Sequence, residues 1–250
     1  MSTPRIRIFA GPNGSGKSTF NRLVPAHLLG KYINPDDIER SIKSTGYFDF
    51  LPFGITSHKD EAIDFLRHHP ILLKTPKSLA KIDGLLIEGE RLNFSHVGVD
   101  SYVASALSDF VRHALILEKI SFTFETVMSS PDKVELLAKA RRAGYRVYVY
   151  YVATVDPEIN VARVAYRVSQ GGHNVPAEKI RQRYERSLEL LSEAILISNR
   201  AYIFDNSDDG QKELTLIAEI TEGEEIVIKT DIQPPWFIKY VIDKLTYNPN

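Results

Sequence analysis

The stretch GPNGSGKS, residues 11–18, decides the fold. It follows RIRIFA, residues 5–10, a short run rich in β-formers that predicts a buried strand ending at a glycine turn. It leads into KSTFNRLVPAHLL, residues 17–29, where apolar residues recur at helical spacing and Pro25 predicts a kink. The glycines, lysine and serine fit the pattern GxxxxGK[ST], and a position between a strand and a helix is the context that this phosphate-binding loop requires.

The residue types of this loop suit the phosphates of a nucleotide. Glycines let backbone amides converge on phosphate oxygens, Lys17 bridges the outer phosphates, and Ser18 is the expected ligand of a metal ion. We therefore expect ATP and Mg²⁺. The expected ATP-binding residues of the loop are Gly11, Pro12, Asn13, Gly14, Ser15, Gly16, Lys17, Ser18 and Thr19. The alternative is a glycine-rich turn that carries a solvated lysine.

Composition limits the classes of partner. Lys and Arg number 31 against 32 Asp and Glu, so no strong overall charge favours nucleic acid or an anionic membrane. The chain has no cysteine, which excludes thiolate chemistry and is compatible with a reducing compartment. No apolar run approaches the roughly 20 residues that span a bilayer. We expect a cytoplasmic protein that binds neither membrane nor nucleic acid.

Strand-like and helix-like segments alternate along most of the chain. Predicted strands at 5–10, 31–34, 120–126, 145–153 and 200–207 alternate with predicted helices of 10 to 15 residues. Such alternation implies right-handed crossovers and a parallel sheet covered by helices on both faces. The sequence therefore predicts an α/β fold of the P-loop NTPase type.

The other segments are expected to elaborate a single domain, residues 1–250. Residues 45–98 mix aromatic turns with short helical and strand-like pieces, and we interpret them as an insertion or cap after the second strand. Residues 208–250 predict a hairpin that turns at Glu222 and Gly223, followed by a last helix. Trp236 in that helix is expected to anchor it on the core.

Carboxylates follow the predicted strands. Asp36 and Asp37 come after YIN, and Glu125 comes after ISFTF. The carboxyl ends of parallel strands open on one crevice, so these acids are placed to receive a proton from a phosphate acceptor. Glu88 also follows an apolar run, but we rank it below Asp36, Asp37 and Glu125 as a carboxylate of the site. The alternative role of Asp36 and Asp37 is helix capping. Glu125 could instead be a buried, hydrogen-bonded acid, or an acid that hydrogen-bonds to a ligand of Mg²⁺.

Arginines flank a glycine break between two predicted helices. Arg163 and Arg167 share a face of the helix 156–170, and Arg183 and Arg186 share a face of the next. Between them lies GGHNVP, residues 171–176. Arginines on such a hairpin would close over the phosphate loop as a lid and hold the transferring group, whereas a solvated face is the alternative.

Several segments together resemble a known family, the zeta-toxin-like P-loop kinases, and most closely its widespread bacterial branch often labelled predicted ABC-type or AAA-family ATPase. The segments that carry the resemblance are, in order, GPNGSGKST, INPDD, SFTFETVMSS, AGYRVYVYYVAT, RVSQGGHNVP, IRQRYERSLELL and RAYIFDNS. Similarity is dense over 5–40 and 101–207. The family also implies an antitoxin protein as a partner.

The resemblance implies an ATP- and Mg²⁺-dependent kinase that phosphorylates a hydroxyl of a small molecule. The best studied zeta toxins use the 3′-hydroxyl of UDP-N-acetylglucosamine. By match of position, the implied roles are Asp36 as general base and substrate contact, Glu125 as substrate contact, Lys17, Arg167 and Arg183 as catalytic cations, and Asp205 and Asn206 near the nucleotide base.

Two departures from the family leave the acceptor open. Zeta toxins continue from the matched glutamate with threonine and arginine substrate contacts, where this chain has Val127 and Ser129. The other functions that the sequence allows are a P-loop ATPase or nucleotide-dependent switch acting through a protein partner, and an interaction module without catalysis. The acidic pair after the second strand favours the kinase, because a switch does not need it.

Overall fold

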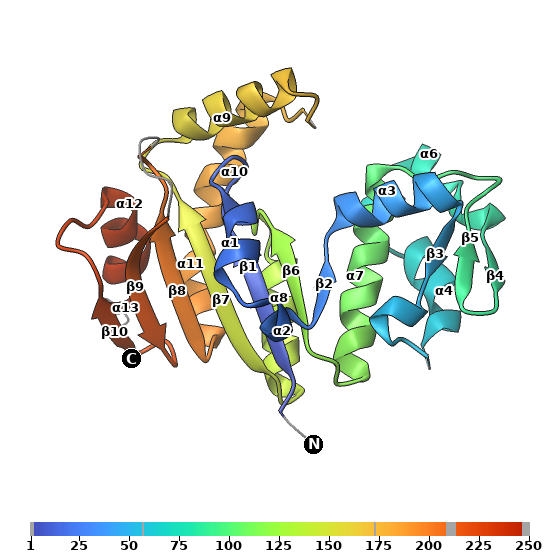
Figure 1. Cartoon of the computed structure of the whole chain (residues 1–250), viewed down its shortest axis with the longest axis horizontal. Coiled ribbons are helices and arrows are strands. Elements are labelled where there is room, and N and C mark those ends of the chain that lie inside the picture. The colour runs from blue at the N-terminus through green and yellow to red at the C-terminus, as the bar shows by residue number, and fades with distance from the viewer. Residues whose placement is uncertain (1–2, 57, 173, 209–213, 247–250) are drawn as a thin grey trace. The chain divides into compact units, whose positions relative to one another are not determined.

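The computed structural model describes residues 3–56, 58–172, 174–208 and 214–246, and it divides into two compact units. The sheet unit comprises Met1–Leu29 and Phe124–Asn250, and the middle unit comprises Gly30–Thr123. Figure 1 shows the elements of both units. Each unit is described by itself.

The sheet unit is built on a mostly parallel sheet. Its strands follow the order β10-β9-β8-β7-β1-β6. The strand bounds are β1 Arg5–Ala10, β6 Phe122–Thr126, β7 Arg146–Ala153, β8 Arg200–Asp205, β9 Thr215–Thr221 and β10 Glu225–Ile228. Strand β7 runs parallel to both β1 and β8, whereas β9 and β10 are antiparallel to their neighbours. The predicted α/β fold with a mostly parallel sheet is confirmed.

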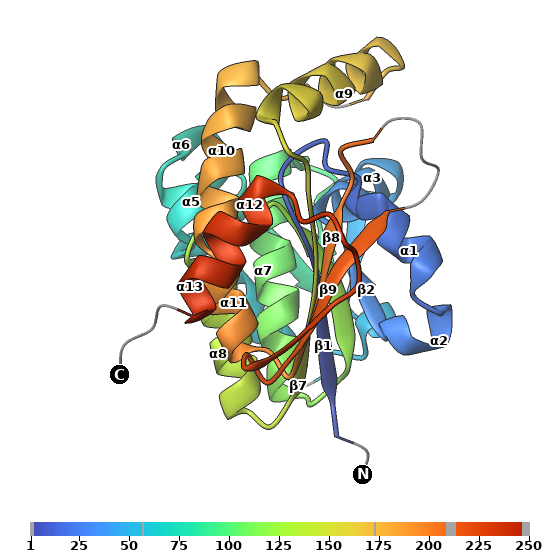
Figure 2. The ribbon, with the colours of Figure 1, turned by 90° about the vertical axis from the view of Figure 1, so that its left-hand side faces the viewer.

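Helices cover both faces of this sheet. Figure 2 shows α8 (Asp132–Arg142), α11 (Leu191–Ile197) and the C-terminal helices on one face, and α1 (Phe20–Leu23) on the other. Phe20 of α1 is fully buried and contacts Phe9 with ring centroids 5.3 Å apart. The strands are apolar on both faces because both faces are covered.

The segment after the phosphate loop breaks where Pro25 predicts. A short 3₁₀ turn at Lys17–Thr19 leads into α1, and α2 (Ala26–Leu29) begins directly after Pro25. The ring of a proline cannot occupy a helix interior without removing a hydrogen bond, which explains the interruption.

A helical hairpin carries the predicted lid. Helix α9 spans Pro157–Ser169 and α10 spans Ala177–Glu189. Asp156 caps α9 by accepting the Glu158 N–H at 2.8 Å. The long helix predicted after residue 176 divides at Leu190 into α10 and α11, although the Leu190 N–H still donates to the Arg186 carbonyl at 3.3 Å. His173 lies outside the described residues.

The C-terminal segment contains the predicted hairpin and helix. Glu222 and Gly223 form the turn between β9 and β10 with φ of 52° and 75°. The last helical segment consists of α12 (Pro235–Phe237), a π-helical turn at Ile238–Ile242 and α13 (Asp243–Thr246). Trp236 is 4% exposed, which confirms its role as an anchor.

The middle unit contains a small antiparallel sheet of order β3-β5-β4 among short helices. Near the start of β6, the Lys31 N–H of β2 donates to the Ser121 carbonyl at 3.0 Å. Segment 45–98 lies wholly within this unit. The bounds are β2 Lys31–Ile33, α3 Pro35–Thr45, β3 Tyr47–Asp49, α4 Ala62–Arg67, α5 Pro70–Leu73, α6 Pro76–Leu79, β4 Leu86–Glu88, β5 Arg91–Asn93 and α7 Ser101–Leu117, with 3₁₀ turns at 51–53, 59–61 and 82–84.

The middle unit is organised on α7. Its N-cap Asp100 accepts the N–H groups of Tyr102 and Val103 and pairs with Lys81 at 2.7 Å. Bonds from Lys81, Val103 and Ser78 outweigh the opposing effect of partial burial and lower the pKa of the Asp100 carboxyl. Among the described parts of the chain, no helix is both long and apolar enough to cross a membrane.

Candidate active site at the phosphate loop

The glycines of the loop are required by its close contacts. Gly11 has φ of 143°, and a Cβ there would lie 2.1 Å from the Val152 carbonyl oxygen at the end of β7. Gly16 has φ of 98°, and its Cβ would lie 2.4 Å from Nδ2 of Asn206. Both positions combine a positive φ with no room for a side chain. Only glycine therefore lets the loop lie this close to the ends of β7 and β8.

Asn160 of α9 holds the phosphate loop through a hydrogen bond to its backbone. It is fully buried, and its Nδ2 donates to the Asn13 carbonyl at 2.7 Å. Its Oδ1 accepts a hydrogen bond from the hydroxyl of Thr154, the residue directly after β7. Gly14, with φ of 78°, packs so closely on Asn160 that a Cβ would lie 2.6 Å from the Asn160 carbonyl oxygen. The loop conformation therefore depends on the first turns of α9.

The segment after β8 supports the other side of the loop. Asn206 donates from Nδ2 to the Ser15 carbonyl at 2.8 Å, and its own carbonyl accepts from Arg163 at 2.7 Å. The Asp205 carboxylate accepts the indole N–H of Trp236 at 2.9 Å. In this structure Asp205 and Asn206 hold protein groups, and their predicted place near the nucleotide base stays a prediction.

Lys17 is folded back onto its own loop. Its Nζ donates to the carbonyls of Gly11 and Pro12, each at 2.9 Å. Burial lowers the pKa of Lys17 to about 8; the carboxylate of Glu125 opposes this shift, whereas Arg167 and Arg183 add to it. Lys17, Glu125, Arg167 and Arg183 thus interact electrostatically, which brings together four predicted site residues from separate segments.

Glu125 is the penultimate residue of β6 and contacts α1, the helix that follows the phosphate loop. Its Oε1 accepts from Nδ2 of Asn21, in α1, at 3.2 Å. Beyond it the chain turns sharply, because Met128 has φ of 52° and its N–H is held by the Thr126 hydroxyl at 3.0 Å. The Val127 carbonyl accepts the hydroxyl of Ser187, from α10, at 2.7 Å. The segment that resembles a substrate-binding strand end is thereby fixed to the lid hairpin.

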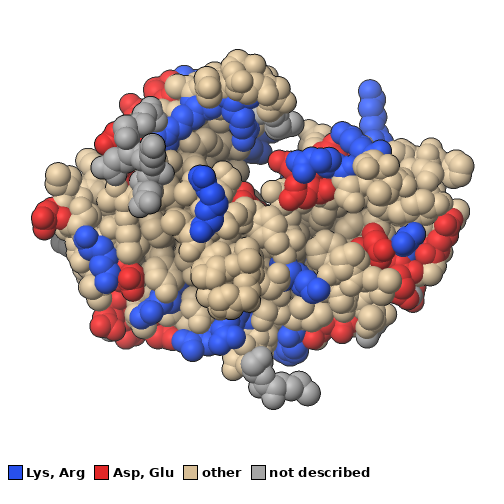
Figure 3. All heavy atoms as spheres, viewed as in Figure 1, with Lys and Arg blue, Asp and Glu red and all other residues tan. Residues whose placement is uncertain are grey.

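The arginines of the hairpin differ in their surroundings. Arg183 is half-buried, and its guanidinium lies 3.4 Å from Oδ1 of Asn13. Burial, followed by the charge of Arg186, lowers the pKa of Arg183. Arg167 is exposed near the end of α9, and Gly172 packs on it so tightly that a Cβ would lie 2.6 Å from its Cγ. Figure 3 shows Lys and Arg side chains gathered along the underside of α9.

The two helices of the hairpin are joined by a bidentate ion pair. Arg181 of α10 donates from Nε to Oε1 of Glu158 at 2.6 Å and from a terminal nitrogen to Oε2 at 2.9 Å. This fork matches the planar geometries of guanidinium and carboxylate. The pair bridges α9 and α10 at the surface.

The Mg²⁺ prediction rests on Ser18. This residue is exposed in the 3₁₀ turn that follows the loop, and the turn is closed by the Thr19 N–H, which donates to the Gly16 carbonyl at 3.0 Å. An exposed hydroxyl at this point fits a cation carried by nucleotide phosphates. Among the described residues, no cluster of three or more acidic or histidine side chains could hold a metal ion.

Asp36 belongs to the middle unit. It is exposed in the first turn of α3, where its N–H donates to Oδ1 of Asn34 at 2.9 Å. Asn34 is therefore the cap of this helix, and Asp37 pairs with Arg40 at 2.7 Å. Glu88 accepts from Asn93 at 2.8 Å in the small sheet. That Asp36 faces the phosphate loop stays a prediction.

Sequence reasoning missed Asn160 and Ser187, which shape the site without belonging to a motif. One signal for Asn160 was available. It lies four residues before the buried Val164, on the face of α9 where an apolar residue is expected. A buried asparagine on such a face needs hydrogen-bond partners, and the loop supplies one.

Known proteins match this chain at several levels. Residues 97–210 match the family model described as Zeta toxin. The predicted resemblance to zeta-toxin-like P-loop kinases is confirmed. An uncharacterized protein of Haemophilus influenzae is 31% identical over 72 residues, which are 29% of this chain and 51% of that protein. The match thus spans about half the length of that relative.

Solved structures support the fold. The AvrRxo1-ORF1:AvrRxo1-ORF2 structure with sulphate ions superposes with a TM-score of 0.53 at 13% identity over 96% of this chain and 64% of its own. A second structure of that pair, with ATP, has a TM-score of 0.50 at 14% identity over 91% of this chain and 61% of its own. The PezAT chromosomal toxin-antitoxin system of Streptococcus pneumoniae gives a TM-score of 0.50 at 12% identity over 100% of this chain and 81% of its own.

Proposed function

We propose that this chain is an ATP-dependent phosphotransferase whose acceptor is a hydroxyl of a small molecule. The zeta toxin match and the P-loop fold support a kinase-type phosphotransferase. The observation that carries the proposal is the interaction of Lys17 with Glu125, Arg167 and Arg183 around a phosphate loop held by Asn160 and Asn206. Several cations directed at one phosphate site suit a transition state in which charge spreads over the transferring group.

Each residue has a proposed role. Lys17 exchanges its two loop carbonyls for phosphate oxygens, Ser18 holds the Mg²⁺ that neutralises phosphate charge, and Arg167 and Arg183 donate to the transferring group. Asp36 accepts the proton of the acceptor hydroxyl, and Glu125 binds the acceptor. The enzyme's contribution is positioning and electrostatic stabilisation, since phosphoryl transfer requires little covalent chemistry from the protein.

A nucleotide sugar such as UDP-N-acetylglucosamine is the acceptor that the family suggests. Val127 and Ser129 replace two family contacts, so we propose a related acceptor that is bound through other side chains. We also propose an antitoxin-like protein partner. Two structural neighbours support it, because one belongs to a toxin-antitoxin system and the other is a pair of proteins, AvrRxo1-ORF1 and AvrRxo1-ORF2.

The test follows the phosphate of ATP. Protein, Mg²⁺ and ATP labelled on the γ-phosphate are incubated alone and with a panel of nucleotide sugars and nucleosides. We expect label in a new small molecule. Asp36→Asn should lose this transfer while ATP binding, measured by calorimetry, is retained. Asp37→Asn is the matched control, because the neighbouring acid pairs with Arg40.

Two outcomes would contradict the proposal. The first is release of free phosphate at the same rate in the presence and absence of every acceptor and unaffected by Asp36→Asn, which would favour the P-loop ATPase or switch. The second is equal loss of transfer in the Asp36 and Asp37 variants with ATP binding intact.

A further inference from the structure

The outer edge of β10 offers unused backbone hydrogen-bonding groups. Strand β10 is last in the sheet order, and no strand within the described ranges pairs with its outer side. Figure 2 looks toward this edge of the sheet unit, with β10 in front of β9. Proteins usually blunt such an edge with proline, a bulge or an inward-facing charge. β10 reads EIVI, and Val227 and Ile228 are 41% and 38% exposed.

The pairing of β10 with β9 fixes which residues face outward. The Lys229 N–H donates to the Ile217 carbonyl at 2.8 Å, continuing the register that pairs Val227 with Glu219. Hydrogen-bonded and non-hydrogen-bonded pairs alternate along an antiparallel ladder. Glu225, Val227 and Lys229 therefore direct their backbone groups at β9, and Ile226 and Ile228 direct theirs away from the sheet.

We propose that this edge binds a second copy of the same chain, with the two β10 strands antiparallel and Val227 opposite the partner's Val227. In that register Ile226 is opposite the partner's Ile228, so the outward N–H and C=O groups of both residues are paired. The two sheets would become one continuous sheet across a two-fold axis.

The side chains favour this register over its neighbours. On one face Glu225 lies opposite the partner's Lys229, and on the other face isoleucine meets isoleucine. Lys229 already pairs with Glu219 at 3.4 Å, so it would lie between two carboxylates. An axis at Ile228 would place Glu225 opposite the partner's Asp231, and an axis at Ile226 would place Ile228 opposite the partner's Glu224.

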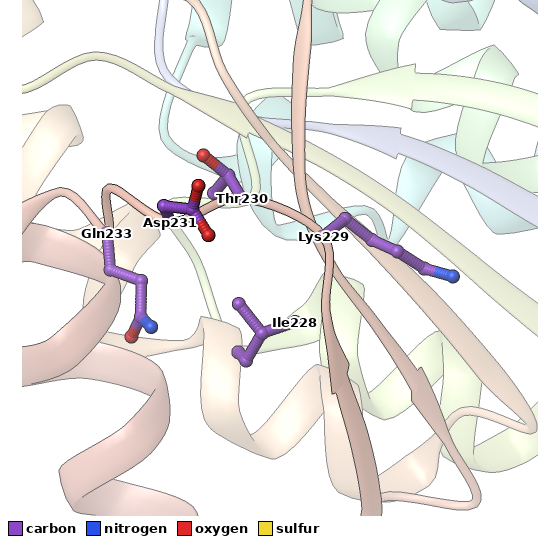
Figure 4. A pocket seen from close by; sticks show the side chains of 5 residues that line it. All are labelled: Ile228, Lys229, Thr230, Asp231 and Gln233. Atoms are coloured by element: carbon purple, nitrogen blue, oxygen red, sulfur yellow. The ribbon is translucent and has the colours of Figure 1, made fainter.

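The surface is also hollowed at the C-terminal end of β10. A surface hollow there is lined by Ile228, Lys229, Thr230, Asp231 and Gln233. Figure 4 shows that the Lys229 side chain points away from the other four. The contact between two short strands is small, and small interfaces are typical of weak association, so we expect a dimer that forms at high protein concentration.

The chain's lack of cysteine allows a direct test. In Val227→Cys the two thiols would face each other across the axis in a non-hydrogen-bonded pair, where Cα atoms lie about 4.5 Å apart, within the range of a disulfide. In the control Ile228→Cys, the Cα atoms would be about 8 Å apart, beyond that range. The control residue has nearly the same exposure as Val227.

We expect mild oxidation to convert Val227→Cys to a disulfide-linked dimer at least about tenfold faster than Ile228→Cys. Sedimentation of the wild-type chain should show a concentration-dependent dimer that is weakened by Glu225→Lys. Equal cross-linking rates of the two cysteine variants would overturn the proposal. So would a wild-type chain that sediments as a monomer at millimolar concentration, or a wild-type dimer whose Val227→Cys counterpart stays reduced.

Discussion

At the scale of single residues, the protonation state of Lys17 bears on nucleotide binding. The ammonium is held by the Gly11 and Pro12 carbonyls, so its charge is compensated before a phosphate arrives. Burial nevertheless holds its pKa at about 8, well below the ordinary value of 10.5. A phosphate stabilises the charged form, and binding must therefore take up a proton wherever Lys17 is neutral.

This linkage predicts a pH dependence of ATP affinity. Below pH 8 Lys17 is protonated and affinity should be constant. Above pH 8 the free protein loses the proton, and affinity should fall by up to about tenfold per pH unit. Titration calorimetry between pH 7 and 9.5 checks this. Lys17→Arg is the control, since its guanidinium stays charged and its curve should be flat; a flat wild-type curve would refute the linkage.

Asn160 is the residue on which the shape of the loop most depends. Asn160→Ala leaves the Asn13 carbonyl and the Thr154 hydroxyl without their buried partner, which should cost about 1–3 kcal/mol of unfolding free energy. ATP affinity should fall as well, because the loop loses its support. Denaturant unfolding and ATP titration measure the two effects.

The matched control for Asn160 is Gln182→Ala, which removes an exposed bond to Glu178 on the adjacent helix. Its stability and ATP affinity should match the wild-type values. An Asn160→Ala protein with unchanged ATP affinity would show that the loop keeps its shape without this contact.

At the scale of elements, the α9–α10 hairpin is both a brace and a source of cations. Asn160 and Arg183 contact the two oxygens of Asn13, one from each helix. Arg181, two residues before Arg183, instead joins the helices through Glu158. The same hairpin therefore places one arginine against the phosphate loop and another in an ion pair between its own helices.

The different contacts of Arg183 and Arg181 predict different effects of their removal on kcat. Arg183→Ala should lower kcat for phosphate transfer by about 100-fold, the usual effect of removing a donor to developing charge. Arg181→Ala should leave kcat within about threefold, because its guanidinium serves the helix pair. Steady-state rates of the labelled transfer decide between them. Equal losses would mean that Arg183 also acts only through the structure of the hairpin.

Local patterns explain what the sequence could predict of these elements. The loop, the break at Pro25, the cap-bounded helix α9 and the hairpin turn at Glu222 and Gly223 all depend on neighbouring residues, and each was predicted. The support of the loop was not, since Asn160 and Asn13 are 147 residues apart and no short motif connects them. The division at Leu190 also escaped prediction, because helical spacing continues across it.

At the scale of the whole molecule, the two units present different problems to sequence reasoning. The sheet unit has long alternating elements whose periods identify them, and its fold class was predicted correctly. The middle unit is built from helices of four to six residues and strands of three, apart from α3 and α7. Such pieces carry too few periods for a pattern to emerge, which is why segment 45–98 could be expected only as an insertion.

The C-terminal helix stabilises the sheet unit through Trp236. Trp236→Ala should lower the free energy of unfolding by about 3–5 kcal/mol, as expected for a large buried aromatic. Trp236→Phe keeps most of the packing and loses the bond to Asp205, so about 1 kcal/mol should be lost. Denaturant unfolding followed by circular dichroism measures both. Equal stability of the alanine variant and the wild type would contradict the anchoring role.

The bond between Trp236 and Asp205 has an optical consequence. Trp236 is the only tryptophan of the chain, so all indole emission comes from one site. Asp205 precedes Asn206, whose side chain holds the Ser15 carbonyl. A shift of the loop on ATP binding would reach Trp236 through these two hydrogen bonds. We therefore expect ATP binding to the unlabelled protein to change its indole emission spectrum.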